Sequence, residues 1–174
     1  MCLKSRRGNV LFEFALAGIP IMLLIISVIE ISRGMWTYCT ISYAVTEGAR
    51  RAIVGGSDCV YPSTCTTRVS DIARQINSSA SAGQFAKSMN VTLSSTGVGC
   101  VAPYTCIPLN KCFLGQVGSA PFPAYPCNAP GSDVIVTATY LFTSPLTMFF
   151  PGLTSSTGGI TTTLHATSQE TIQF

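Results

Sequence analysis

Charged residues are scarce in this sequence of 174 residues. It holds ten Lys or Arg and seven Asp or Glu, so 10% of the chain is charged, whereas an ordinary soluble domain carries roughly 25%. This scarcity argues against a free cytosolic globule and against a nucleic-acid-binding protein. The length predicts one domain together with an apolar segment.

Histidine is almost absent as well, because His165 is the single imidazole. Ser-His-Asp hydrolysis and His-rich metal sites have almost nothing to draw on, although one His can in principle serve a Cys or Ser nucleophile. A thiol enzyme based on Cys39 lacks both a Cys-x-x-Cys motif and a nearby His. We therefore expect a protein that is not an enzyme and that uses no cofactor and no metal.

A long apolar run is present near the N-terminus. It covers 21 residues from Asn9 to Ile29 and is interrupted only by Glu13. About 20 predominantly apolar residues suffice for a membrane-spanning helix, and packing inside a membrane tolerates a proline such as Pro20. A cleaved signal peptide is the alternative, but its apolar region has about 7 to 15 residues and ends at an Ala-x-Ala-like site. Since only the poor match Ser42-Tyr43-Ala44 follows, we expect an uncleaved apolar helix.

The basic residues around this run predict its orientation. Lys4, Arg6 and Arg7 precede it, while Arg33 is the only basic residue in the first turns after it. Basic residues beside a span tend to stay in the cytoplasm. The N-terminus is therefore expected in the cytoplasm and the C-terminal domain in the periplasm, and the more distant Arg50-Arg51 weakens this count without reversing it.

Six cysteines lie beyond the apolar run, and they favour an oxidising compartment. A zinc site is the alternative, but the repeated Cys-x5-Cys step misses zinc-knuckle spacing and no His is near. Disulfides are therefore expected, with 15 possible pairings. The candidates are Cys59, Cys65, Cys100, Cys106, Cys112 and Cys127. Proximity alone favours the pairs Cys59–Cys65, Cys100–Cys106 and Cys112–Cys127, and leaves Cys2 and Cys39 over.

The remaining pattern predicts an α+β fold with a small antiparallel sheet. Three-to-four spacing of apolar residues extends the first helix over residues 9–54, with Gly55-Gly56 as its stop. The periplasmic domain then covers residues 55–174. Its expected parts are a helix capped by Thr66-Thr67 and ending near Gly83, strands at 89–96, 134–142 and 160–168, and an irregular disulfide-stapled loop at 97–131.

The residues at the start of the apolar run form the most informative motif. The basic leader Arg6-Arg7 ends at Gly8, and the carboxylate of Glu13 stands at the fifth position after that glycine. A charge at the bilayer centre costs about 2.5–3.5 kcal/mol on insertion scales, and less near the edge. Cleavage after Gly8 would give Asn9 an α-amino group that pairs with Glu13 in the same or a neighbouring chain. The alternative is an interfacial, snorkelling Glu13 without a special role.

This arrangement resembles the type IV pilin and pseudopilin signature, and more closely the TadE-like family of the tight-adherence (Flp) pilus machinery. The resemblance covers about residues 6–54, and the stretch Val134–Phe142 with Pro145-Leu146 is also similar. The residues that carry it are Arg6-Arg7-Gly8, Glu13-Phe14, Ala15-Leu16, Pro20, Glu30 with Arg33, and the segment from Tyr43 to Arg50 that contains Glu47-Gly48-Ala49-Arg50.

The resemblance implies a role for several of these residues. Arg6 and Arg7 belong to a leader that a prepilin peptidase removes after Gly8, Asn9 becomes the first residue, and Glu13, followed by Phe14, is the assembly carboxylate. The chain would be a minor pseudopilin of the bacterial inner membrane. Its expected partners are the membrane, the peptidase, other pilins or pseudopilins and the assembly platform, and its expected role is pilus assembly for adherence and biofilm formation.

Two features depart from the family pattern. Major Flp pilins are much shorter, so the 120 residues after Val54 point to a minor component, and the six-cysteine region has no counterpart.

Removing Lys4, Arg6 and Arg7 would leave seven basic and seven acidic side chains, so the basic excess is a signal for topology and recognition. The alternative function is a permanently anchored, disulfide-rich periplasmic binding domain.

Overall fold

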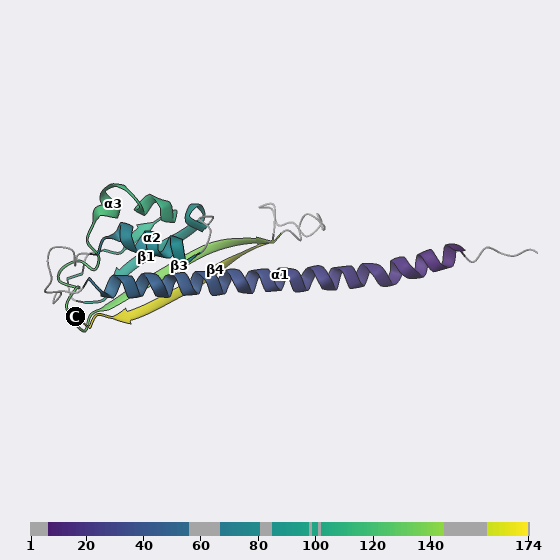
Figure 1. Cartoon of the computed structure of the whole chain (residues 1–174), viewed down its shortest axis with the longest axis horizontal. Coiled ribbons are helices and arrows are strands. Elements are labelled where there is room, and N and C mark those ends of the chain that lie inside the picture. Colours follow the sequence, from purple (N-terminus) through teal and green to yellow (C-terminus); the bar gives the residue numbers. More distant parts are fainter. Residues whose placement is uncertain are drawn as a thin grey trace, which may run out of the picture. The chain divides into compact units, whose positions relative to one another are not determined.

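The computed structural model describes residues 7–55, 67–80, 85–97, 99–100, 102–144 and 160–173. The described residues fall into two compact units, one drawn from the ranges Met1–Trp36 and Ser144–Ile160 and the other from Thr37–Thr143 and Thr161–Phe174. The elements are α1 (Arg7–Ile53), α2 (Val69–Ser79), η1 (Phe85–Lys87), β1 (Met89–Ser95), β2 (Tyr104–Cys106), η2 (Leu109–Cys112), α3 (Gly115–Ser119), β3 (Asp133–Ser144) and β4 (Ile160–Thr171) (Figure 1). The predicted α+β class is confirmed.

Helix α1 is continuous over 47 residues and contains Pro20. It begins two residues earlier and ends one residue earlier than the sequence pattern predicted. Its end is a turn in which the backbone N–H of Gly55 donates to the carbonyl of Ala52 at 3.2 Å. Arg50 and Arg51 lie in the last turn, where positive charge is favourable next to the C-terminal end of the helix dipole.

Helix α2 buries the apolar stripe that its spacing predicted: Val69, Ile72, Ala73 and Ile76. The predicted cap at Thr66-Thr67 is wrong, because the N-cap residue is Arg68. The backbone N–H of Arg68 donates to Oδ2 of Asp71 at 3.2 Å. The carboxylate of Asp71, the third residue of the helix, therefore supplies the hydrogen-bond acceptor that this N–H needs. Thr67 instead accepts a hydrogen bond at its carbonyl from the N–H of Phe122 at 2.8 Å, and Thr66 lies outside the described residues.

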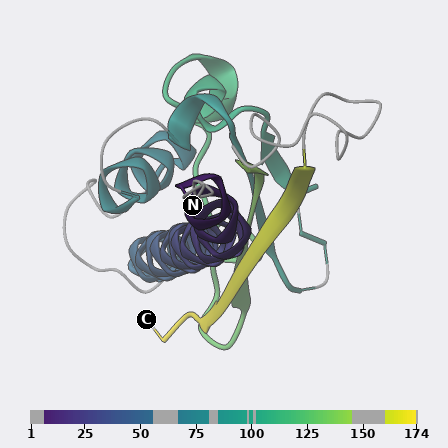
Figure 2. The same ribbon diagram turned by 90° about the vertical axis from the view of Figure 1, so that its right-hand side faces the viewer.

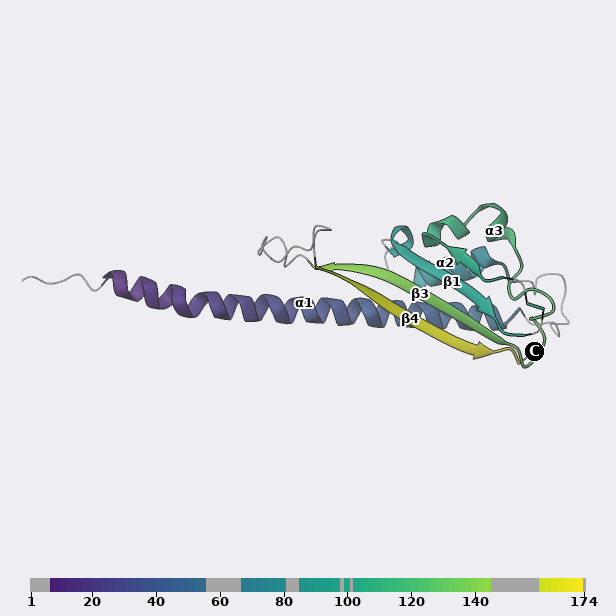
Figure 3. The same ribbon diagram turned by 180° about the vertical axis from the view of Figure 1, so that it is seen from behind.

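The sheet has four strands in the order β2-β1-β3-β4. The three strands predicted from alternation are confirmed as β1, β3 and β4, and Figure 3 shows them side by side. The fourth, β2, was not predicted, because residues 97–131 were expected to be too irregular for a ladder. Residues 104–106 nevertheless pair antiparallel with β1, with Cys106 opposite Val91. The ladder needs only three residues, and such a short strand leaves no alternating pattern to detect.

The core of the second unit lies between this sheet and two helices. Figure 2 shows α2 and the C-terminal turns of α1 on the same face of the sheet. The sheet contributes inward-facing residues from β1 and β3, including Val91, Leu93, Val134 and Val136, and the helices contribute residues such as Ile41, Val45 and Ile76. The part of α1 from Thr37 to its C-terminal end is therefore an integral part of this unit.

The opposite face of the sheet carries a row of threonines. Thr92 in β1 is opposite Thr105 in β2 and opposite Thr137 in β3. The hydroxyls of Thr137 and Thr167 in β4 lie 3.3 Å apart. Cross-strand Thr pairs stabilise a sheet, so this row ties all four strands together on the exposed face.

Two disulfides are described, Cys100–Cys127 and Cys106–Cys112, with Cα–Cα distances of 5.5 and 5.6 Å. The pairs Cys100–Cys106 and Cys112–Cys127, which proximity favoured, are therefore wrong. Pairing of β2 with β1 buries Cys106 on the core side, where η2 brings Cys112 beside it. Cys59 and Cys65 lie outside the described residues, and Cys39 is free and exposed, as expected.

Candidate membrane-anchoring and assembly site

The N-terminal part of α1 exposes apolar side chains around its whole circumference. From Phe12 onward the helix is long and apolar enough to cross a membrane, and the most apolar window, of mean hydropathy 2.5, has none of its residues buried. A helix that is apolar on all sides and uncovered by protein requires a lipid or neighbouring-helix environment. Large exposed side chains on consecutive turns include Phe12, Leu16, Ile19, Leu24, Val28 and Ile31.

The predicted processing and assembly residues lie at the beginning of this helix. Gly8 and Asn9 are in the first turn of α1. The first N–H groups of a helix have no intrahelical acceptor, so this turn opens at lower cost than the helix interior. Glu13 is exposed, and Phe14 is 76% exposed. Arg7 is the first helical residue, and Arg6 lies outside the described residues.

Ser27 places a hydroxyl inside the apolar run of α1, and Ser32 places one just beyond it. The hydroxyl of Ser27 donates to the carbonyl of Leu23, and that of Ser32 donates to the carbonyl of Val28, each at 2.8 Å. Both bonds reach back four residues within the same helix, which is the usual way to satisfy a hydroxyl in an apolar environment. These serines therefore need no partner from another helix.

Glu30 follows the apolar run and is the more enclosed of the two carboxylates in this part of α1. Its side chain is 12% exposed, and its Oε1 lies 3.7 Å from Nη1 of Arg33. The hydroxyl of Ser144, the last residue of β3, donates to Oε2 at 3.0 Å. A half-buried carboxylate requires such partners to offset the loss of water. The Glu30–Arg33 pair quoted in the sequence resemblance is thus a contact, and Ser144 completes it.

Aromatic residues follow this polar cluster along the helix. Trp36 is 70% exposed, and Tyr38 and Tyr43 are also exposed. Trp and Tyr are enriched at the boundary between the bilayer and water. The order of the side chains along α1, apolar first, then Glu30 with Arg33, then aromatic, is therefore that of a span leaving the membrane.

The segment Glu47-Gly48-Ala49-Arg50 has a packing role in the second unit. Gly48 and Ala49 are buried, and a Cβ atom on Gly48 would lie 2.5 Å from Cγ1 of Ile76 in α2. On the outer side, Nη1 of Arg50 donates to Oε1 of Glu47 at 3.1 Å. Glycine at this position thus allows the two helices to approach closely, and the charged residues pair across one turn.

The sequence analysis identified Glu30 with Arg33 and the Glu47–Arg50 segment, but it did not identify Ser144. Its partner lies 114 positions earlier, and a serine at the end of an alternating strand gives no signal of such a contact. Among the described residues no group of three or more His, Cys, Asp or Glu could hold a metal ion.

Comparison with known families matches one model, described as TadE-like protein, to residues 8–50. This match confirms the TadE-like resemblance predicted from the N-terminal motifs. It includes Gly8, Glu13, the Glu30–Arg33 pair and the Glu47–Arg50 segment, and it ends before the rest of the second unit. Comparisons with curated proteins and with solved structures found no match. The apolar helix and the TadE-like segment together support single-pass membrane anchoring in a tight-adherence pilus system.

Proposed function

We propose that this chain, with its TadE-like segment, is a membrane-anchored minor pseudopilin required to assemble a tight-adherence (Flp) pilus. Its role is structural and not enzymatic. The N-terminus faces the cytoplasm and the second unit faces the periplasm. A prepilin peptidase cuts after Gly8, and the processed helix then packs among other pilins, pseudopilins and platform proteins, which serves surface adherence and biofilm formation.

One observation carries the proposal: the uncovered apolar helix has a single exposed carboxylate, Glu13, at the fifth position after Gly8. Within a bilayer this carboxylate costs free energy unless a cation approaches it. Cleavage creates that cation at the α-amino group of Asn9. In an assembly of such helices, Glu13 of one chain and the amine of a neighbour would then fix the axial register.

The processing step is tested by sequencing the mature N-terminus from membranes of cells that hold the peptidase. We expect the chain to begin at Asn9, and we expect Gly8→Ala to retain Met1 and the longer mass. Gly18→Ala is the matched control, because Gly18 lies on the same helix beyond the cut. A wild-type chain that still begins with Met1 would instead favour a permanently anchored periplasmic binding domain.

The assembly step is tested with Glu13→Gln in a pilus complementation assay. Because the amide has no charge, we expect normal membrane insertion and normal cleavage but loss of pili. Glu170→Gln, a change of the same kind on β4, serves as the control and should leave pili intact. Unaltered pili in the Glu13→Gln strain would refute the assembly role of this carboxylate.

A further inference from the structure

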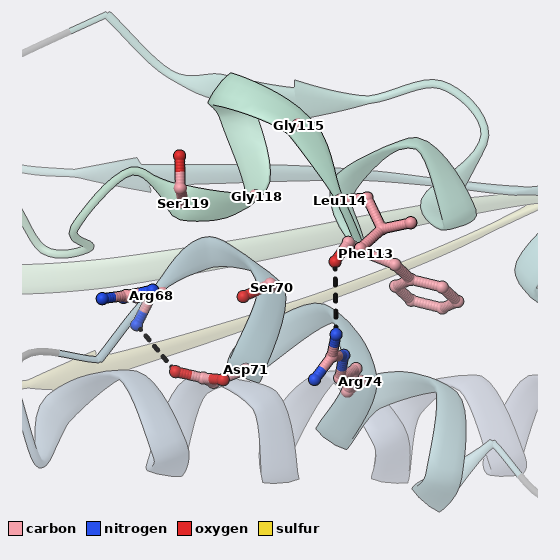
Figure 4. Close-up of a pocket in the computed structure, with 9 residues that line it drawn as sticks. All are labelled: Arg68, Ser70, Asp71, Arg74, Phe113, Leu114, Gly115, Gly118 and Ser119. Atoms are coloured by element: carbon pink, nitrogen blue, oxygen red, sulfur yellow. Dashed lines mark hydrogen bonds between the residues drawn. The ribbon is translucent and has the colours of Figure 1, made fainter.

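A groove lies along α2 and faces the segment formed by η2 and α3 (Figure 4). Arg68 and Arg74 lie towards its two ends, and Ser70 and Asp71 lie between them. The opposite wall consists of Phe113, Leu114, Gly115, Gly118 and Ser119. All of these residues belong to the second unit, so the groove is a feature of that unit alone.

A second hollow continues this groove along the helix. It shares Asp71 and Arg74 with the first and adds Arg51 from the last turn of α1, together with Gln75 and Ser78. The two hollows together therefore present three guanidinium groups and one carboxylate. This is a local basic excess in a chain whose processed form has balanced charge.

The arginines of this groove differ from Arg33 and Arg50 of α1 in their ion pairing. Arg33 and Arg50 each pair with a glutamate three residues earlier. Within the described part of the chain, no ion pair joins Arg51, Arg68 or Arg74 to a carboxylate. Each guanidinium has five N–H donors and keeps its charge, so their capacity to bind an anion is largely unused.

The intervening acid offsets one of the three positive charges and leaves the cluster with a net positive charge. Oδ2 of Asp71 accepts the backbone N–H of Arg68 at 3.2 Å, as part of the helix cap. Nη2 of Arg74 donates to the carbonyl of Phe113 at 3.4 Å, which orients its guanidinium at the wall of the groove (Figure 4). The remaining donors of Arg74 are then available to a ligand.

The wall opposite α2 is held in place before any ligand binds. The disulfide Cys106–Cys112 joins β2 to η2. Gly118 packs so closely that a Cβ atom would lie 2.6 Å from the carbonyl oxygen of Cys112. Because this wall is already ordered, binding of a ligand would cost less conformational entropy.

The rim of the groove adds apolar surface. Leu114, which lines the groove, is 77% exposed. Arginine and aromatic residues, such as Phe113 in the same wall, are enriched in the cores of protein interfaces. A small inorganic anion would use the guanidinium groups but not this rim.

We propose that this groove binds an acidic segment of a partner protein, with two carboxylates against Arg68 and Arg74 and an apolar side chain on Leu114. The two arginines are six residues apart, about 9 Å along a helix. Carboxylates two residues apart on an extended segment share one face and are about 7 Å apart, and the flexible arginine side chains can span the difference, while the residue between the carboxylates faces the opposite wall with Leu114. This binding does not depend on processing after Gly8 or on the role of Glu13.

The test is a titration of the full chain in zwitterionic micelles with a short fluorescein-labelled peptide. The peptide has two glutamates two places apart with a leucine between them, and a second peptide has glutamines instead. We expect the glutamate peptide to bind, to shift the amide resonances of Gly115, Gly118 and Ser119, and to weaken with added salt.

The matched variants are Arg68→Gln/Arg74→Gln and Lys87→Gln/Lys111→Gln, which remove the same charge inside and outside the groove. We expect the arginine pair to weaken binding by about tenfold, as two exposed ion pairs allow, and the lysine pair by less than twofold. Circular dichroism checks that both variants are folded. Equal binding of the glutamine peptide, equal effects of the two variants, or shifts of these resonances only with phosphatidylglycerol vesicles would overturn the proposal.

Discussion

The hydroxyl of Ser144 donates a hydrogen bond of 3.0 Å to Oε2 of Glu30, which lies 114 positions earlier in the chain. Arg33 approaches the other oxygen of the same carboxylate at 3.7 Å. The end of β3 is therefore attached to α1 at the point where its apolar run stops. No local pattern in the sequence requires this contact.

Removing that hydroxyl should destabilise the protein measurably. A hydrogen bond to a charged group contributes about 1.5–3 kcal/mol, and partial exposure of the cluster reduces this, so we expect Ser144→Ala to lower the free energy of unfolding by about 1–2 kcal/mol. Thermal unfolding in micelles provides the measurement, and Ser144→Thr, which keeps the hydroxyl, is the control. In a Glu30→Ala background the same change should cost little, and an unchanged cost there would contradict the contact.

Close packing at Gly48 gives a second prediction. A Cβ at this position would lie 2.5 Å from Ile76 Cγ1 and 2.8 Å from Cδ1, so Gly48→Val should overpack the contact between α1 and α2 and cost about 2 kcal/mol or more. Denaturant unfolding measures the loss. Gly18→Val is the control, because the nearest atom to a Cβ there is Phe14 Cε1 at 4.0 Å. Adding Ile76→Ala should make the Gly48→Val change less costly, and strict additivity would argue against this packing.

The two described disulfides should differ in their contribution to stability. Their sequence separations are 27 for Cys100–Cys127 and 6 for Cys106–Cys112. In the chain-entropy account, the longer loop contributes about 3.5 kcal/mol and the shorter about 2.2 kcal/mol. Replacing each pair by serines and measuring unfolding tests this order, and mapping of non-reduced peptides tests the pairing itself. A Cys100–Cys106 peptide would show that the described pairing is wrong.

Trp36 reports the depth of the helix, because it is the only tryptophan. It follows Phe12 by 24 residues, about 36 Å along a helix, which exceeds the hydrocarbon thickness of about 30 Å. We expect lipids brominated near the headgroup to quench its fluorescence more than lipids brominated near the chain end. The control is Leu24→Trp in a Trp36→Phe background, for which the order should reverse. The same order in both proteins would exclude this placement.

Periodicity predicted most of the fold because large apolar faces must be buried. The stripe of α2 and the alternation of β3 are strong signals, and both elements form where expected. The anchoring segment was equally clear, since an apolar run of this length has few other uses. These predictions depend on local residue order, which is what a sequence displays directly.

Contacts between distant segments were not predictable in the same way. The predicted disulfide Cys100–Cys106 rested on nearness along the chain, which reflects only the entropy of closing a loop. In the structure, the pairing of β2 with β1 turns the side chain of Cys106 into the core. Cys100 instead meets Cys127 beside Gly97, where a Cβ atom would lie 3.0 Å from the sulfur of Cys127. Ser144 escaped notice for the same reason, because its partner is in another part of the chain.

The hydroxyls of Ser27 and Ser32 return to carbonyls of their own helix. These hydroxyls therefore need no hydrogen-bond acceptor from a neighbouring chain when the helix enters the lipid. Glu30 already has partners within the chain, Arg33 and Ser144, so Glu13 is the carboxylate of this part of α1 that still lacks a cation in the described contacts. Under the proposed function, insertion into the bilayer and association with other chains are therefore separate events, and association waits for the α-amino group that pairs with Glu13.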